Sequence, residues 1–209
     1  MLQPDQQYYT VEEYLWEEQR SSFKREYFKG QVYAMAGGSL KHSLIAVNLV
    51  SELRAQLRGS GCQVFNSDLK VAVPGISRPK GRKRREGEEF VTYPDAGIIC
   101  GKPEYYKDDE YTIANPVALF EVLSPSTRVY DRNTKSEEYK KIPSLIYYIM
   151  LDSERARVEC RRRVDNDSWI EIAPLASLSD TLQIFVSREV IIPLASLYEG
   201  ITFDDGEAD

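Results

Sequence analysis

The chain has 209 residues, which fits one domain with a sizeable core, and we treat residues 1–209 as a single domain with an acidic tail at about 203–209. Its composition, 42% hydrophobic and 29% charged, is typical of globular proteins. The net charge of −6 disfavours strong non-specific binding to nucleic acid, because proteins of that class usually carry a basic footprint.

The N-terminus is polar and lacks the apolar segment of a signal peptide, and no apolar run approaches the ~20 residues of a membrane helix. We therefore expect no membrane association. The three cysteines, Cys62, Cys100 and Cys160, form no zinc-binding pattern, and their odd, scattered count argues against a disulfide framework. A reducing cytoplasm is the simplest compartment, with Cys100 in the core.

The first predicted element is a helix over residues 10–20, where Thr10 and Glu13 have the spacing of a capping box. Alternation around Gly30 predicts a β-hairpin over 23–35. A longer helix is predicted over 40–58, with an N-cap at Ser39 and Gly59 after its end. Its predicted buried stripe is Leu40, Leu44, Val47, Val50, Leu53 and Leu57.

Residues 62–73 alternate as one strand, which would turn Asp68 and Lys70 to the same face. They are either an exposed pair on an edge strand, or Asp68 is an additional acidic group beside a site. The following loop carries a basic block that includes Arg82, Lys83, Arg84 and Arg85. Such a block is either a solvated charge run or an arm that contacts DNA phosphates.

The central stretch, residues 90–151, contains two apolar strands that each carry one carboxylate: Asp95 in VTYPDAGIIC and Glu121 in VALFEVLSP. Buried carboxylates are costly unless they are paired or bind a metal. A long loop at 101–115 joins these two strands, and a lysine-bearing helix at roughly 131–142 and an apolar strand, LIYYIML, follow them. Two acids on neighbouring strands beside a lysine indicate a site.

The rest of the chain predicts a hairpin around residues 165–167, then two strands and a short helix in TLQIFV and EVIIPLASLY. These last elements carry no recognisable chemistry. We expect them to extend the sheet or to form a dimer contact.

The runs YPDAGIIC, ALFEVLSPST and YDRNTKSEEYKKIPSLIYYIMLD resemble the Uma2 family of predicted restriction endonucleases, in the PD-(D/E)XK nuclease superfamily. The resemblance covers roughly residues 8–200. It implies an α/β fold with a restriction-endonuclease-like core, in which a central mixed β-sheet is flanked by helices and extended by an N-terminal helix and hairpin.

The resemblance also implies site roles. Asp95 and Glu121, with the backbone carbonyl of Val122, would bind Mg²⁺ or Mn²⁺, whose preferred ligands are oxygens. The superfamily usually places a lysine two residues after the glutamate, where this chain has Leu123. In the Uma2 pattern the matching lysine is on the next helix, at Lys135. The other reading of Lys135 is a surface pair with Asp131, four residues earlier.

Glu26 and His42 each have two interpretations. The family pattern places Glu26 at the edge of the site, but the residue also fits a solvent-facing strand position paired with Lys24. His42, the only histidine, is either a surface or capping residue at a helix start, or a side chain supporting the site, since family members carry a histidine after Gly-Gly-Ser.

The sequence therefore predicts a metal-dependent endonuclease acting on DNA, with Asp95, Glu121, Lys135 and Glu26 as its catalytic residues. We expect a homodimer, because two sites most easily cut two strands. The alternative is a nuclease-fold module that binds or regulates nucleic acid without cleaving it, favoured by Leu123 and the acidic charge balance.

Overall fold

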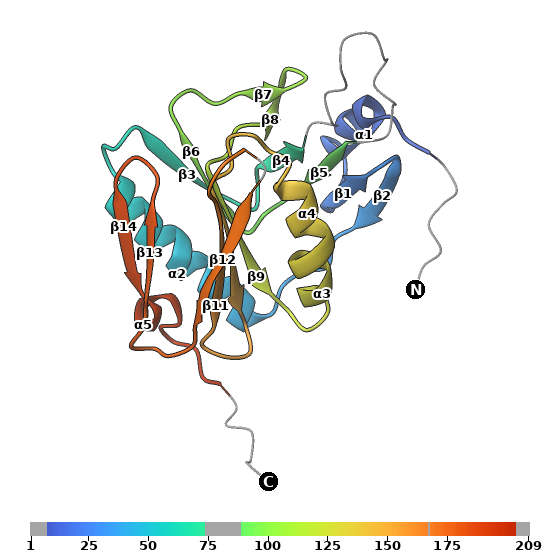
Figure 1. Cartoon of the computed structure of the whole chain (residues 1–209). Helices are drawn as coiled ribbons and strands as arrows, with labels where there is room; N and C mark the ends of the chain where they lie inside the picture. Colours follow the sequence, from blue (N-terminus) through green and yellow to red (C-terminus); the bar gives the residue numbers. More distant parts are fainter. Residues whose placement is uncertain (1–7, 74–88, 167, 204–209) are drawn as a thin grey trace.

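The computed structural model describes residues 8–73, 89–166 and 168–203, and it contains two six-stranded sheets, a separate hairpin and flanking helices (Figure 1). The central sheet consists, in spatial order, of β12 (Trp169–Leu175), β11 (Val158–Arg163), β10 (Tyr147–Asp152), β9 (Ala118–Leu123), β6 (Ala96–Cys100) and β3 (Cys62–Asn66). The outer sheet consists of β2 (Gln31–Ala34), β1 (Arg25–Phe28), β5 (Phe90–Thr92), β4 (Lys70–Val73), β8 (Asp109–Ile113) and β7 (Tyr105–Tyr106).

The remaining elements are the hairpin and the helices. They are β13 (Thr181–Phe185), β14 (Glu189–Pro193), α1 (Val11–Glu18), α2 (Leu40–Leu57), α3 (Arg128–Tyr130), the π-helical turn η1 (Asp131–Lys135), α4 (Ser136–Tyr139) and α5 (Leu194–Leu197). We call the continuous segment α3–η1–α4, residues 128–139, the site helix. No helix in the described part of the chain is long and apolar enough to cross a membrane.

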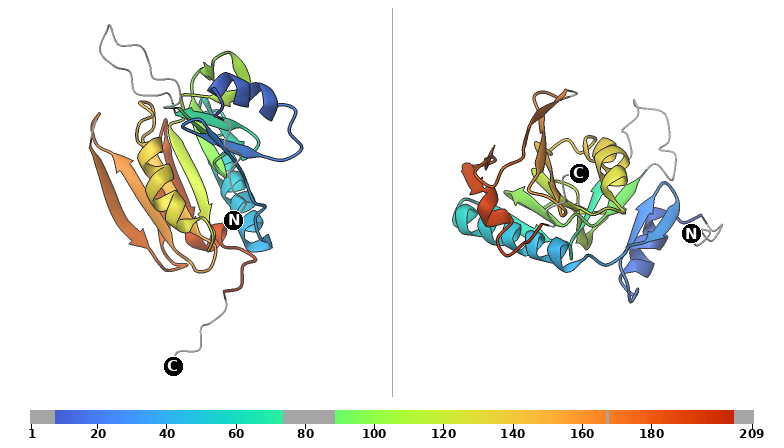
Figure 2. Two further views of the ribbon diagram at one scale, coloured as in Figure 1. Left: turned by 90° about the vertical axis from the view of Figure 1, so that its right-hand side faces the viewer. Right: turned by 90° about the horizontal axis from the view of Figure 1, so that it is seen from below.

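The central sheet is mixed, because β9 and β10 are parallel and their other neighbours run antiparallel. All residues of β9 and β10 are buried, as expected for parallel strands that are covered on both faces. Figure 2 shows α2 and the site helix on opposite sides of this sheet. The predicted fold class, a mixed sheet flanked by helices, is confirmed.

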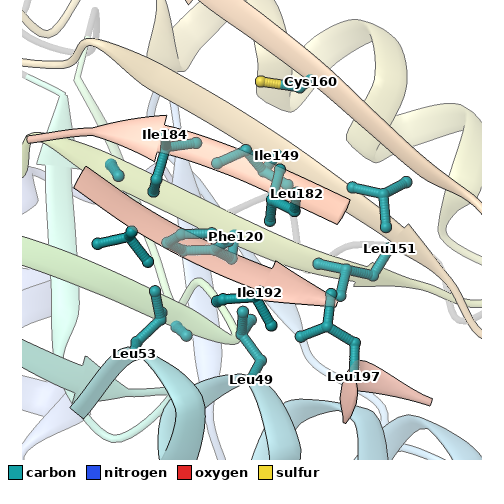
Figure 3. Close-up of a cluster of buried hydrophobic side chains, with 14 of the residues drawn as sticks. Leu49, Leu53, Phe120, Ile149, Leu151, Cys160, Leu182, Ile184, Ile192 and Leu197 are labelled. Carbon is teal, nitrogen blue, oxygen red and sulfur yellow. The ribbon is translucent and has the colours of Figure 1, made fainter. Parts of the chain in front are cut away.

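The largest core lies between the central sheet, α2 and the β13–β14 hairpin (Figure 3). Phe120 and Val122 of β9 point into it, while Leu119 and Leu123 point into a second core under the site helix and the outer sheet. Alternate residues of a strand face opposite sides of a sheet. Glu121 therefore belongs to the face that the site helix covers.

The predicted N-terminal helix and hairpin are present, and Thr10 and Glu13 form the predicted capping box. The predicted strand over 62–73 is wrong, because the chain turns after Asn66 and continues as β4 in the other sheet. The predicted loop at 101–115 contains the β7–β8 hairpin. The terminal strands do not extend the sheet but pair with each other and pack on α2.

The buried stripe of α2 also differs from the prediction, although the ends of the helix are as expected. Its fully buried residues are Ile45, Leu49, Leu53 and Leu57. Leu40 and Val47 are instead 75% and 58% exposed. α2 contacts the sheet along a line of residues that are each four positions apart, whereas the predicted stripe mixed steps of three and four.

The expectation that the cysteines do not pair is wrong. Cys62 and Cys100 are direct partners across β3 and β6 and form a disulfide, while Cys160 is free and buried. Cysteine spacing in the sequence says nothing about which strands become neighbours. The bond also removes the ground for a reducing compartment, since disulfides persist mainly in oxidising ones.

Replacement of Leu53 tests the position of the buried stripe. We expect Leu53→Ala to lower the free energy of unfolding by about 2–5 kcal/mol, because it opens a cavity in the largest core. Val47→Ala, on the exposed side of the same helix, should change it by less than ~0.5 kcal/mol. Denaturant titration measures both, and equal losses would contradict the assignment of the stripe.

Thiol counting tests the cysteine pairing. The unfolded, unreduced protein should show one thiol, Cys160, and the reduced protein three. Reduction should also lower stability by roughly 2–4 kcal/mol, because it frees the unfolded chain. Detection of three thiols before reduction would refute the bond.

Candidate active site

The site begins at Glu121, in the middle of β9 and on the face covered by the site helix. Its residue exposure is only 3%. Lys135 of the site helix, equally buried, places its Nζ 2.9 Å from Glu121 Oε1. The Tyr139 hydroxyl donates a second hydrogen bond to the same oxygen, at 2.8 Å. The carboxylate is therefore held from two successive turns of one helix.

Asp95 lies directly before β6, the antiparallel neighbour of β9. Its Oδ2 accepts a hydrogen bond of 2.7 Å from the backbone N–H of Val122. In a strand, the N–H and C=O of one residue point to the same edge, as the paired hydrogen bonds of antiparallel ladders require. The carbonyl of Val122 therefore lies on the Asp95 side of β9.

Asp131 is the neighbour of Lys135 on the other side, with Oδ1 3.7 Å from Nζ. This pair was predicted as an alternative to a role for Lys135, but both contacts exist and both are buried. Residues 131–135 form a π-helical turn, a feature that often occurs at functional sites. Asp131 was not among the predicted site residues.

These side chains line one cavity of about 1220 Å³. Asp95, Glu121, Val122, Asp131 and Lys135 all contribute to its lining. Pockets for small molecules have volumes of roughly 300–1,000 Å³, so this cavity has room for part of a larger substrate. The structure thus brings together the two acids and the lysine that the sequence placed in separate elements.

The ionisation of the pair follows from burial and charge. Burial raises the pKa of Glu121 well above its ordinary value, and the nearby Lys135 opposes that shift. Burial would lower the pKa of Lys135, but the negative charges of Glu121, Glu26 and Asp131 outweigh it and raise that pKa. Lys135 is therefore a charged ammonium group at neutral pH, aimed at the carboxylate.

His42, in the first turn of α2, also reaches this site. Its Nε2 lies 3.3 Å from Asp95 Oδ2. Gly38 makes this position possible, because a β-carbon there would lie 2.7 Å from His42 Nδ1. Hydrogen bonding to Asp95 raises the pKa of His42, although partial burial opposes the shift. The histidine therefore contacts an acid of the site rather than standing on the surface.

Glu26, on β1 of the outer sheet, lines the same cavity. It accepts a 3.3 Å hydrogen bond from the hydroxyl of Tyr130, on the site helix. Lys24, its suggested strand partner, instead forms an ion pair with Asp68 at 2.9 Å. The suggested pair of Glu26 with Lys24 is therefore wrong, and the half-buried Glu26 instead joins the outer sheet to the site helix.

Asp68 is in the turn between β3 and β4, outside the lining of the cavity. Its side chain is 76% exposed. The predicted role beside Asp95 required a continuous strand through residue 68, which the structure does not contain. The basic residues Arg82, Lys83, Arg84 and Arg85 lie outside the described residues.

The donor set fits a hard divalent cation. In the described contacts, Asp95 Oδ1 and Glu121 Oε2 accept no hydrogen bond, so one oxygen of each acid is left to serve as a ligand. Within the described ranges, no three His, Cys, Asp or Glu side chains are grouped as a metal site would group them. Mg²⁺ commonly uses only one or two carboxylates, with waters and substrate phosphate completing its shell.

The site lacks the strand lysine of the superfamily pattern. Leu123, which occupies that position, is buried in the second core on the same face of β9 as Glu121. Lys135 reaches Glu121 from the helix that covers this face. An ammonium group is therefore present beside the acid although the strand position is apolar.

The sequence predicted the pair of Asp131 with Lys135 only as a surface contact, and it assigned Tyr139 no contact with Glu121. A signal for both was available, because Asp131, Lys135 and Tyr139 are four residues apart and share one face of a helix. What the spacing did not reveal is that this face is buried against Glu121.

The single histidine permits a direct test of the contact with Asp95. We expect a proton NMR titration in a metal chelator to give His42 a midpoint above 6.5, which Asp95→Asn should lower. Because the folded pKa is raised, this contact stabilises the protein below the unfolded pKa, and the contribution is lost as pH rises through the folded pKa. A midpoint that is the same in the unmodified protein and in Asp95→Asn would contradict the contact between His42 and Asp95.

Comparisons with known proteins agree with this architecture. The sequence model of the Uma2 family, described as "Putative restriction endonuclease", matches residues 6–190. "Uncharacterized protein slr1290" of Synechocystis sp. is 34% identical over 93% of both chains. "Uncharacterized protein sll1609" of the same organism is 29% identical over 77% of this chain and 84% of its own.

A solved structure shares the fold: a crystal structure of "a putative nuclease belonging to DUF820" from Anabaena variabilis. It superposes with a TM-score of 0.66 at 14% identity and covers 91% of this chain and 97% of its own. At that identity the likeness concerns the fold alone. The family match extends over most of the sequence, and the chain belongs to the Uma2 family.

Proposed function

We propose that this protein is a metal-dependent endonuclease that hydrolyses DNA phosphodiester bonds. The observation that carries the proposal is the buried Glu121–Lys135 pair, which lines the same cavity as Asp95. Burying two charges costs several kcal/mol per ion, and a purely structural pair is often replaceable by apolar residues. A cavity-lining ion pair with an adjacent second acid is better explained by chemistry.

The acids and the lysine have different roles in this proposal. Asp95 and Glu121, with the Val122 carbonyl, would hold Mg²⁺ or Mn²⁺. The bound ion would lower the pKa of a water and neutralise charge on the phosphate. Lys135 is a hydrogen-bond donor beside Glu121, so it can orient an attacking water or stabilise charge that develops on the scissile phosphate.

The neighbouring residues would position these groups. Tyr139 holds one oxygen of Glu121, which leaves the other to face the ion. Val122 N–H and His42 hold Asp95 in the same way. Phosphoryl transfer depends mainly on positioning and charge neutralisation, and it needs no covalent intermediate with the protein. Glu26 would complete the acidic shell, and a homodimer would supply one site for each strand.

The second candidate is a module that binds nucleic acid without cutting it. Leu123 in place of the usual lysine favours it. So does the lining of the cavity, in which the described residues contribute five carboxylates and two lysines. The two candidates differ in one respect: an endonuclease cleaves the nucleic acid that it binds, and a binding module does not.

Removal of the buried pair tests the proposal. Replacing only one residue of the pair would leave the other charge buried without a partner, which lowers the stability of the protein by ~3–5 kcal/mol. Both residues must therefore be replaced together. We expect Glu121→Gln/Lys135→Met to remain folded and to nick plasmid DNA in Mn²⁺ at least about 10²-fold more slowly, because it lacks the transition-state donor. EDTA should abolish nicking by the unmodified protein.

The matched control is the pair of Glu137, which is exposed, and Lys140, which is half-buried and directly follows the site helix. Their charged atoms are 2.7 Å apart, and neither residue lines the cavity. Glu137→Gln/Lys140→Met should nick at the unmodified rate. If the unmodified protein binds DNA but does not nick it in either metal, the binding module is the correct reading.

A further inference from the structure

The cavity has a second wall, made of apolar groups, that the proposed chemistry does not use. We call it the apolar wall; its members are Ala34, Met35, Ala36, Ala46, Val47 and Val50. The first three close β2 and begin the connection to α2, and the last three are on α2 itself. The wall therefore joins the outer sheet to the helix that carries His42.

The exposed part of the apolar wall consists of Ala34, Ala36 and Val47, while Ala46 and Val50 are half-buried against the largest core. Val47 is 58% exposed, and Ala34 and Ala36 are exposed as well. A β-carbon added at Gly37, next to Ala36, would meet no atom within 4 Å. Val47 therefore faces the cavity, and no residue in the described part of the chain covers it.

The charges of the cavity limit what can bind there. Its described lining carries five carboxylates, on Glu26, Asp95, Glu121, Asp131 and Glu154, against the ammonium groups of Lys24 and Lys135 and the imidazole of His42. A bound cation compensates for only part of this excess. Phosphate contacts with this lining are therefore a poor source of affinity, and among the described residues of the cavity the apolar wall is a surface that can add to it.

The chemistry of a nucleic-acid strand matches this combination. Its phosphodiester must reach the carboxylates and Lys135, and its bases offer flat faces of low polarity. In a duplex those faces are stacked and inaccessible, and enzymes that need a base take it out of the stack. Enzymes that extrude a base hold it between aromatic or apolar side chains. Contact with the face of a base tolerates any base sequence, as in proteins that stack single strands on aromatic rings.

We infer that the apolar wall receives the face of an unpaired nucleobase next to the scissile phosphodiester, so that the strand cleaved is single-stranded or locally opened. This inference rests on the proposed nuclease function, which it narrows to a substrate class. The carboxylates and Lys135 act on the backbone of the strand, and the wall holds a neighbouring base.

Val47 provides the protein side of the test, since its exposure allows substitution without disturbing the core. Affinity is measured by fluorescence anisotropy with a labelled single-stranded DNA in Ca²⁺, and cleavage is measured in Mn²⁺. Val47→Ser should weaken binding about tenfold, near the low end of the range for loss of an aromatic stacking partner, because valine offers a smaller apolar face. Val47→Phe, which enlarges the apolar face, should strengthen it.

The matched controls are Leu40→Ser and Leu40→Phe, because Leu40 is 75% exposed on the same helix but does not line the cavity. Neither should change affinity. Thermal melting checks that all four variants fold as the unmodified protein does.

The ligand side uses three variants of the same oligonucleotide. Annealing to its complement should lower both affinity and cleavage, and an abasic strand should bind the unmodified protein as weakly as the normal strand binds Val47→Ser. An RNA strand of the same sequence separates the two sources of an unpaired base. Removing the bases should not weaken Val47→Ser further, since that variant has already lost the contact.

The outcomes separate the two proposals. Cleavage of duplex and single strand at equal rates, unaffected by Val47, overturns this inference and leaves the nuclease intact. Val47-dependent binding of single strands without cleavage in any metal overturns the nuclease and leaves the base-binding wall. Absence of binding to every oligonucleotide overturns both.

Discussion

The structure around the site depends on the buried contact between Lys135 and Glu121. Two charges that are almost completely removed from water are tolerated only when geometry and further hydrogen bonds compensate for the lost hydration. Here Glu121 accepts from Lys135 and Tyr139, and Asp131 faces the ammonium from the preceding turn. The helix carrying these groups is thereby tied to the middle of the central sheet.

The same contact explains how apolar packing and reactive groups share one strand. β9 directs Phe120 and Val122 into the largest core and Leu119 and Leu123 into the second. Glu121 lies between the last two on its own face, where an unpaired carboxylate would be destabilising. The site helix supplies its partners, so the second core and the site are completed by one element.

The two sheets meet at the cavity, and that meeting determines its chemistry. The central sheet contributes Asp95 and Glu121 and the outer sheet contributes Glu26, while α2 contributes His42 and Val47. The result is a charged side beside an apolar side. A nucleic-acid strand also has two such parts, its backbone and its bases, which is why we connect the apolar wall with unpaired bases.

The sequence by itself determined the local features and the family. Capping at Thr10 and Ser39, the turn at Gly30 and the apolar strands around Asp95 and Glu121 depend on neighbouring residues, and their patterns predicted them correctly. Only the tertiary structure decided which distant groups meet. Asp68 lies outside the site because the chain passes from one sheet to the other at that turn. Cys62 forms a disulfide with Cys100 because β3 and β6 are neighbours. Val47 faces the cavity because α2 contacts the sheet along a different line of residues from the predicted one. Each of these outcomes depends on strand order and helix rotation, which are set by the packing of the whole chain and leave no trace in the spacing of a few residues.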